Sequence, residues 1–310
     1  MTAGARPRVA ILGAGAMGSL FAYHLAQDND VTLVDVREEV VAAITARGGV
    51  QLDEGPVRAV AATRDARQAY AANFLFVFVK APSTLAAVRA FGGKLNPATP
   101  VVSLQNGLGN EEAIKAALGG AVALVIGVTD VASFAVGPGH SRPLGRGRTV
   151  IGSAGSSTAT VRLVCELISA SGLECSTAYD IRPHLWGKLL ANAAINPIAA
   201  LAGANNEVVA SDPDAAQLAR QIALEGAAVA RALRISLPFP DPWEYVRGIV
   251  LATTESRNSM AVDLAAHAKT EIDAVNGAIV AAGARYGIPT PYNEALVRLI
   301  RAKERRVVQR

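Results

Sequence analysis

The residues Val9-Ala10-Ile11-Leu12-Gly13-Ala14-Gly15-Ala16-Met17-Gly18 decide the fold. The apolar run at their start has the length of a buried strand, and Ala16–Gln27 has the apolar spacing of a helix. Between strand and helix lies G-x-G-x-x-G, in which the glycines permit a tight turn, a close phosphate and close helix packing. A merely structural glycine turn is the alternative. In this context the pattern predicts a dinucleotide site formed by Gly13, Ala14, Gly15, Ala16, Met17 and Gly18.

The residues after the second predicted strand, Val31–Val34, distinguish the two nicotinamide cofactors. Asp35 lies where a carboxylate binds the ribose hydroxyls of NAD and repels the 2′-phosphate of NADP. Arg37 could instead pair with that phosphate, or be an ordinary solvated residue at the start of the next helix. We therefore expect NAD(H) or NADP(H), with NAD favoured because the carboxylate holds the expected position.

Strand-like and helical segments alternate through the first half of the chain. Further apolar runs of strand length occur at Phe74–Val79, Val101–Leu104 and Val122–Ile126. Such runs suit parallel strands covered on both faces, so the pattern predicts an α/β fold with a Rossmann-type doubly wound parallel sheet. The segment Gly48–Ala62, with Asp53-Glu54-Gly55 at its centre, is interpreted as an inserted hairpin.

The second half of the chain changes character. From about Ile181 onward the periodicity is helical, and Asp212-Pro213 has the composition of a helix start. We expect a dinucleotide-binding Rossmann domain at 1–178 and an all-helical substrate and catalytic domain at 179–310. The Ala- and Gly-rich helices of the second domain could pack within one chain or across the two-fold axis of a homodimer.

Composition excludes several classes of protein. The chain has 310 residues, of which 51% are hydrophobic and 18% charged, so it is not disordered. The longest uncharged stretch, Leu189–Asn206, contains four asparagines and Pro197, which argues against a membrane span. The N-terminus runs straight into a strand without a signal-peptide pattern, so we expect a cytoplasmic protein. Scattered histidines predict no metal site.

The net charge of +4 arises from one end of the sequence. No aromatic residues are interleaved with the C-terminal cations, so we expect no nucleic-acid partner. These cations are Arg298, Arg301, Lys303, Arg305, Arg306 and Arg310.

The stretch Leu185–Pro197 carries polar residues at helical spacing. Lys188, Asn192 and Asn196 are four residues apart, so they share about 80° of one helix face. Their neighbours are small or apolar, and polar groups buried without partners cost free energy. A bound polar ligand is one partner for them; an internal network or a lysine reaching solvent is the alternative.

The sequence resembles the ketopantoate reductases along its whole length. The resemblance includes the glycine motif, Lys80 after the third apolar run, and Gln105-Asn106-Gly107-Leu108-Gly109. It continues with L-W-x-K-L-x-x-N-x-x-I-N-P at Leu185–Pro197, N-S-M-A-V-D at Asn258–Asp263, and K-T-E-I-D-A-V-N-G at Lys269–Gly277.

The resemblance implies reduction of 2-dehydropantoate to pantoate with a nicotinamide cofactor, a reaction of pantothenate biosynthesis. It implies that Lys188 is the general acid and that Glu271 acts at the junction of cofactor and substrate. The implied substrate-binding residues are Asn106, Asn192, Asn196, Asn206 and Ser259, and Lys80, Asn106 and Glu271 are implied cofactor contacts. A lysine is chemically suited to the role implied for Lys188, since an ammonium stabilises and protonates the alkoxide that hydride addition creates.

The chain departs from the usual family pattern S-S-M-x-Q-D, because Asn258 and Val262 replace a serine and a glutamine. We therefore carry two alternatives to a ketopantoate reductase. One is an NAD-dependent D-2-hydroxyacid dehydrogenase for another branched or bulky substrate. The other is a non-catalytic protein that senses NAD(P).

Overall fold

The computed structural model describes residues 6–119 and 122–308, with side chains described as far as Arg305. The described chain forms two compact units. Unit 1 comprises residues up to 105 together with 110–181, and unit 2 comprises 106–109 together with 182–310.

Unit 1 is built on a sheet of eight strands among the described residues. Neighbouring strands are parallel except β8 (Leu124–Thr129) and β11 (Arg148–Ser153), which are antiparallel. The expected α/β fold is confirmed, and the antiparallel pair is the one departure from it. It arises because no crossover helix follows β8. In sheet order the strands are β12 (Glu174–Thr177), β11 (Arg148–Ser153), β8 (Leu124–Thr129), β7 (Val101–Ser103), β6 (Phe74–Val77), β1 (Arg8–Leu12), β2 (Asp30–Val34) and β5 (Ala61–Thr63).

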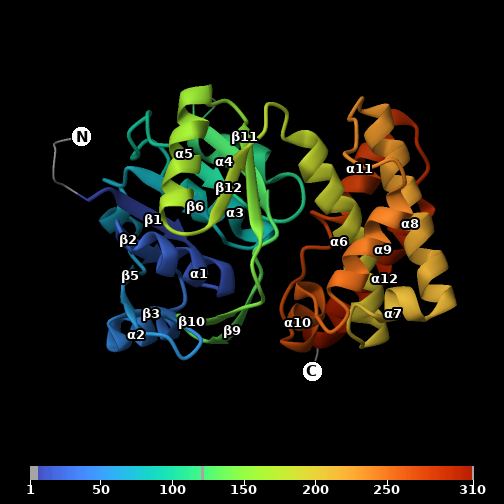
Figure 1. The fold of residues 1–310 in the computed structure, drawn as a ribbon, viewed down its shortest axis with the longest axis horizontal. Helices are drawn as coiled ribbons and strands as arrows, with labels where there is room; N and C mark the ends of the chain where they lie inside the picture. Colours follow the sequence, from blue (N-terminus) through green and yellow to red (C-terminus); the bar gives the residue numbers. More distant parts are fainter. Residues whose placement is uncertain (1–5, 120–121, 309–310) are drawn as a thin grey trace. The chain divides into compact units, whose positions relative to one another are not determined.

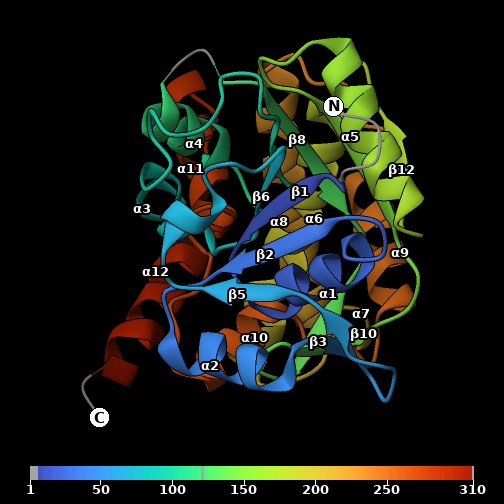
Figure 2. The same ribbon diagram turned by 90° about the vertical axis from the view of Figure 1, so that its left-hand side faces the viewer.

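Helices cover both faces of this sheet (Figures 1 and 2). Helices α1 (Ala16–Leu25) and α5 (Thr158–Ala170) pack on one face, and α3 (Thr84–Arg89) and α4 (Asn110–Leu118) lie together on the other. The apolar strand β6 is buried at every position, as its composition predicts. Helix α2 (Glu38–Arg47) packs beside β5, and η1 (Ala66–Ala69) and η2 (Ala81–Ser83) are single 3₁₀ turns.

A smaller sheet lies beside the main one. The strands β3 (Gly49–Leu52) and β4 (Arg58–Ala59) form the antiparallel hairpin predicted from Gly48–Ala62, although its last residues belong to β5. The strands β9 (Ser133–Gly137) and β10 (His140–Pro143), which were not predicted, complete it.

In its described part, unit 2 consists of helices joined by loops. Helix α6 (Arg182–Ala202) is central, because most of the other described helices of this unit pack against it. Asp212 caps α8 as predicted: its side chain accepts a hydrogen bond from the Ala215 N–H, and Pro213 is the first helical residue. The other helices are α7 (Val208–Ser211), α8 (Pro213–Ala232), α9 (Pro242–Ala252), α10 (Ser259–Ala265), α11 (Asn276–Tyr286) and α12 (Pro291–Val308).

Three predictions from the sequence concern a membrane span, a metal site and a nucleic-acid partner, none of which was expected. Across 6–119 and 122–308, no helix combines the length and apolarity needed to cross a membrane. The same residues contain no cluster of three or more side chains suited to hold a metal ion. Some cations of the basic C-terminal helix form ion pairs within the chain: Arg301 pairs with Asp273 at 2.7 Å, and Arg298 pairs with Glu294. Arg310 and the Arg306 side chain lie outside the described residues.

Candidate functional site

The glycine turn of unit 1 joins β1 to α1 as its sequence predicts. Gly13 has φ +97°, in the left-handed region that favours glycine. A Cβ atom on Gly18 would lie 1.8 Å from the Gly13 carbonyl oxygen, so the helix start approaches the turn too closely for a side chain. A Cβ on Gly15 would meet nothing within 4 Å, which leaves open space beside the first N–H groups of α1. This cradle fits the pyrophosphate of a dinucleotide.

Asp35 and Arg37, the two residues with opposite implications for the cofactor, form an ion pair. The Arg37 Nε and Nη2 atoms donate to the two Asp35 carboxylate oxygens at 2.9 and 2.8 Å. The Ala14 N–H of the glycine turn donates to the same carboxylate at 2.8 Å. Burial disfavours the ionised carboxylate, but the hydrogen bonds from Arg37 and Ala14 outweigh it and hold the pKa of Asp35 below its usual value. A charged carboxylate is therefore fixed beside the turn.

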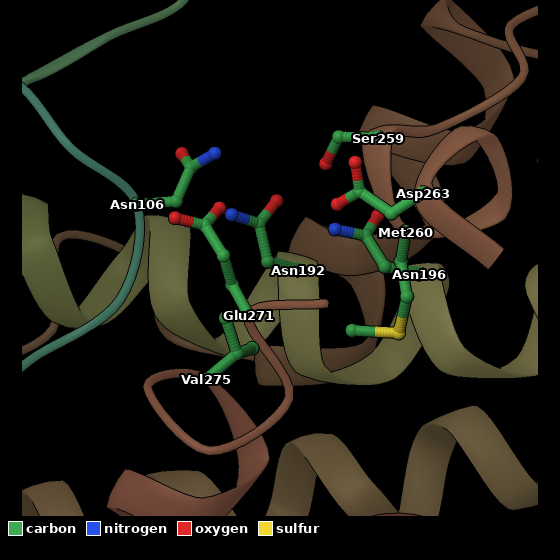
Figure 3. Close-up of a pocket in the computed structure, with 8 residues that line it drawn as sticks. All are labelled: Asn106, Asn192, Asn196, Ser259, Met260, Asp263, Glu271 and Val275. Atoms are coloured by element: carbon green, nitrogen blue, oxygen red, sulfur yellow. The ribbon is translucent and has the colours of Figure 1, made fainter. Parts of the chain in front are cut away.

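A pocket in unit 2 gathers polar residues from four segments of the chain (Figure 3). The side chains of Asn106, Asn192 and Glu271 lie at one end, and those of Asn196, Ser259 and Asp263 lie at the other. Met260 and Val275 supply apolar surface. In order along the chain the lining residues are Asn106, Asn192, Asn196, Ser259, Met260, Asp263, Glu271 and Val275.

The continuous helix α6 positions the two amides of one wall. Because residues four apart lie on the same side of a helix, Asn192 and Asn196 reach the pocket together. Lys188 lies one turn before Asn192 on the same face and is half-buried. It is not one of the pocket-lining residues.

Glu271 belongs to the segment between α10 and α11, and its neighbours fix its direction. Thr270 donates through its N–H and its hydroxyl to Glu304 Oε1 on α12, at 2.8 and 2.7 Å. Ile272 is fully buried in the core formed with α6, α10 and α12. With both neighbours anchored, the carboxylate of Glu271 is held at the pocket, where the residue is only 9% exposed.

The loop that carries Asn106 packs closely against the segment between α10 and α11. The Leu108 N–H donates to the Ala274 carbonyl oxygen at 2.8 Å. Gly107 has φ +80°, and a Cβ there would lie 2.5 Å from that oxygen. Only glycine fits at this position, which explains why glycine follows Asn106 in the motif.

The amide of Asn206 is engaged by neighbouring side chains of unit 2. Its Oδ1 accepts a hydrogen bond from Asn258 Nδ2 at 3.0 Å, and its Nδ2 donates to the Thr253 hydroxyl at 3.2 Å. Asn258 also caps α10, because its Oδ1 accepts from the Ala261 N–H at 3.0 Å. Asn206 is buried and is not among the residues that line the pocket.

Five residues predicted from sequence therefore share one pocket: Asn106, Asn192, Asn196, Ser259 and Glu271. Gly13 to Gly18, Asp35, Arg37 and Lys80 belong to unit 1. Sequence reasoning gave no role to Met260, Asp263 and Val275, which also line the pocket. The spacing of four residues between Ser259 and Asp263 on α10 is the signal that could have identified the aspartate.

The donor set decides what the pocket can bind. Asparagine amides and a serine hydroxyl both donate and accept, so they bind carboxylates, carbonyls and hydroxyls without adding charge. Asp263 and Glu271 are acceptors when ionised and favour a ligand with hydroxyl groups. An anionic ligand needs a cation near these carboxylates, and Lys188 is the lysine one turn from Asn192.

Comparison with known proteins gives matches along almost the whole chain. The sequence model described as ketopantoate reductase PanE/ApbA matches residues 9–156, and its C-terminal counterpart matches 180–304. A 2-dehydropantoate 2-reductase of Pyrobaculum aerophilum is 36% identical over 95% of this chain and 97% of its own length.

Solved structures resemble the fold equally closely. The PanE/ApbA family ketopantoate reductase of Ralstonia eutropha JMP134 is 32% identical, with a TM-score of 0.89 over 97% of this chain and 99% of its own. A D-mandelate dehydrogenase solved with NADH and anilino(oxo)acetate is 28% identical, with a TM-score of 0.90 and the same coverage. These matches confirm the resemblance drawn from the motifs. The chain therefore belongs to the ketopantoate reductase PanE/ApbA family of oxidoreductases.

Proposed function

We propose that this protein uses a nicotinamide cofactor to reduce a 2-oxoacid, 2-dehydropantoate in the first instance, to the 2-hydroxyacid. The pocket of unit 2, in which five predicted residues meet, is the observation that carries the proposal. In this proposal residues 1–178 form the dinucleotide-binding domain and 179–310 the substrate and catalytic domain. The substrate is a small molecule, and we place the activity in the cytoplasm.

The glycine turn would hold the pyrophosphate, with Asp35 and Arg37 beside the adenosine ribose and Lys80 and Asn106 as further contacts. A dihydronicotinamide bound there would supply the hydride for the substrate carbonyl carbon. NAD(H) is the proposed preference, because the Asp35 carboxylate is fixed next to the turn by the Ala14 N–H.

The residues of unit 2 act on the substrate. Lys188 donates a proton from Nζ to the carbonyl oxygen as negative charge develops there. Asn192 and Asn196 bind the polar groups of the substrate, and Ser259 contacts its carboxylate. Glu271 accepts a hydrogen bond from a substrate hydroxyl or orients the lysine.

A steady-state comparison of substrates tests this proposal. The protein is assayed with 2-dehydropantoate, with 2-oxoisovalerate, which lacks the hydroxymethyl group, and with an aryl 2-oxoacid, each with NADH and with NADPH. We expect the highest kcat/KM with 2-dehydropantoate, because a pocket that hydrogen-bonds a hydroxyl discriminates against the analogue without it. Equal or faster turnover of another 2-oxoacid would replace 2-dehydropantoate as the substrate.

The second candidate is a D-2-hydroxyacid dehydrogenase for a bulkier substrate. Two observations favour it: the similarity to D-mandelate dehydrogenase, and the engagement of Asn206 by Asn258. An amide used within the protein is not offered to the substrate. Preference for the aryl 2-oxoacid in the same assay would support this candidate.

Oligomeric state is a separate part of the proposal. We expect the Ala- and Gly-rich helices of unit 2 to form a homodimer interface where they do not pack within the chain. Analytical ultracentrifugation measures this, and a monomer at micromolar concentration contradicts it.

A further inference from the structure

Helix α6 contains a proline inside the stretch that carries the pocket amides. Pro197 has no backbone N–H, so the hydrogen bond that the Ala193 carbonyl oxygen accepts in a regular helix is missing. Ala193 is fully buried, and water is no substitute donor there. A buried carbonyl without a partner destabilises the local structure.

A side chain from α11 supplies the missing donor. Asn276 Nδ2 donates to the Ala193 carbonyl oxygen at 3.0 Å. Asn276 is fully buried, and its Oδ1 atom has no hydrogen-bond partner. The side-chain hydrogen bonds of Asn276 are therefore formed by its nitrogen and not by its oxygen.

A second asparagine accepts a hydrogen bond from the same amide nitrogen. Asn276 Nδ2 also donates to Asn293 Oδ1 at 3.0 Å. The Nδ2 atom of Asn293 donates to Glu225 Oε2 at 2.8 Å, which leaves its oxygen to face Asn276. Asn293 is itself fully buried, so the arrangement is sheltered from solvent.

The hydrogen bond joins the two walls of the pocket. Ala193 and Pro197 are the residues next to Asn192 and Asn196 on α6. Asn276 directly follows Val275 and lies five residues after Glu271. We propose that Asn276 is a positioning residue, which replaces the N–H that Pro197 lacks and thereby holds Asn192 and Asn196 in register with Glu271. This role rests on the proposed reduction of a 2-oxoacid.

A double-mutant cycle tests the inference. Asn276→Ala, Pro197→Ala and the double variant are compared with the wild-type protein. Alanine at 197 restores a backbone N–H, so the helix itself can supply the bond to Ala193. Asn293→Ala is the matched control, because it disturbs the same buried network and leaves the Asn276 bond to Ala193 in place. The readouts are kcat and KM for the 2-oxoacid, the dissociation constant for NADH, and the urea midpoint of unfolding.

We expect Asn276→Ala to raise KM or lower kcat, with kcat/KM falling about tenfold or more, since small displacements of binding groups are costly. In the Pro197→Ala background the same substitution is expected to cost less than about threefold, because the carbonyl has its own donor. Asn293→Ala lowers the urea midpoint but changes kcat/KM by less than about threefold. The NADH dissociation constant is unchanged throughout.

Three outcomes overturn the inference. They are an equal kinetic effect of Asn276→Ala in both backgrounds, a lowered urea midpoint with unchanged kinetics, and an equal kinetic effect of Asn293→Ala. Wild-type protein that reduces no 2-oxoacid overturns the proposed function, but it does not test whether Asn276 replaces the N–H that Pro197 lacks. In that case the urea midpoints still report whether Pro197→Ala compensates Asn276→Ala, which tells the two failures apart.

Discussion

At the scale of single residues, we expect the choice of cofactor to depend on the ion pair of Asp35 and Arg37. The carboxylate favours ribose hydroxyls and the guanidinium favours a phosphate, so removing each should have the opposite effect. We expect Asp35→Ala to lower the ratio of kcat/KM with NADH to that with NADPH, and Arg37→Ala to raise it, each by about tenfold. The measurement is that ratio at saturating 2-oxoacid. An unchanged ratio in both variants removes this pair from cofactor recognition.

The same pair predicts how stability depends on pH. The folded-state pKa of Asp35 is lowered, so the folded protein binds fewer protons there than the unfolded chain. Its contribution is present above the unfolded pKa of about 3.9 and is lost as pH falls through the folded value. We expect the wild type to exceed Asp35→Asn in unfolding free energy at pH 7 and the difference to shrink below pH ~4. Urea titrations at several pH values measure it; a constant difference contradicts the prediction.

At the scale of elements, two glycines at the start of α1 should separate folding from binding. A Cβ on Gly18 would collide with the Gly13 carbonyl oxygen, whereas a Cβ on Gly15 meets nothing within 4 Å. We expect Gly18→Ala to lower the melting temperature sharply or prevent folding. Gly15→Ala should keep the wild-type melting temperature and weaken NADH binding about tenfold or more, because the methyl group occupies the space for the phosphates. Normal NADH affinity in Gly15→Ala would remove this turn from the cofactor site.

Two substitutions at the start of α10 should separate stability from substrate specificity. Asn258 both caps the helix and holds the Asn206 amide. We expect Asn258→Ala to cost about 1 kcal/mol of unfolding free energy for the lost cap. Asn258→Ser keeps a capping side chain but releases Asn206, so it should retain most of that stability. It should also shift kcat/KM toward 2-oxoacids that carry a hydroxyl group. A serine variant with unchanged substrate preference would show that Asn206 does not affect specificity.

Element by element, local patterns predicted the fold well. The apolar runs at β1, β2, β6 and β7, the helices between them and the Asp212-Pro213 start of α8 each follow from a few neighbouring residues. The strands β9 and β10 and the antiparallel placement of β11 were not predicted. β10 pairs with β3, which lies far earlier in the chain, and β11 pairs with β8, and a strand's own residues do not encode which strand becomes its partner.

Part of the candidate site could be expected from helix geometry, and the rest depends on tertiary packing. Asn192 and Asn196 share a face through helix geometry alone, so their meeting could be expected. That Asn206 turns to Asn258, and that Asp263 enters the pocket, depends on how α10 packs against α6. For Asn206 this packing leaves no pattern in the sequence, whereas the spacing of Ser259 and Asp263 places both side chains on one face of α10.

At the scale of the whole molecule, the proposed activity divides between the two units. The dinucleotide cradle consists of residues of unit 1, and the polar pocket consists of residues of unit 2. A substitution in α6 should therefore abolish chemistry without affecting dinucleotide binding. A protein that only senses NAD(P) would show binding and no chemistry from the start.

The most direct test measures NAD(P)H oxidation by the wild type and by Lys188→Ala with a 2-oxoacid, alongside the dissociation constant for the dinucleotide. Lys94→Ala, which removes an exposed lysine of unit 1, is the control. We predict that the wild type and the control oxidise NAD(P)H, and that Lys188→Ala loses about 10²–10⁴-fold in kcat with unchanged dinucleotide affinity. Turnover by Lys188→Ala within about threefold of wild type, or a wild type that binds the dinucleotide and reduces no 2-oxoacid, would contradict it.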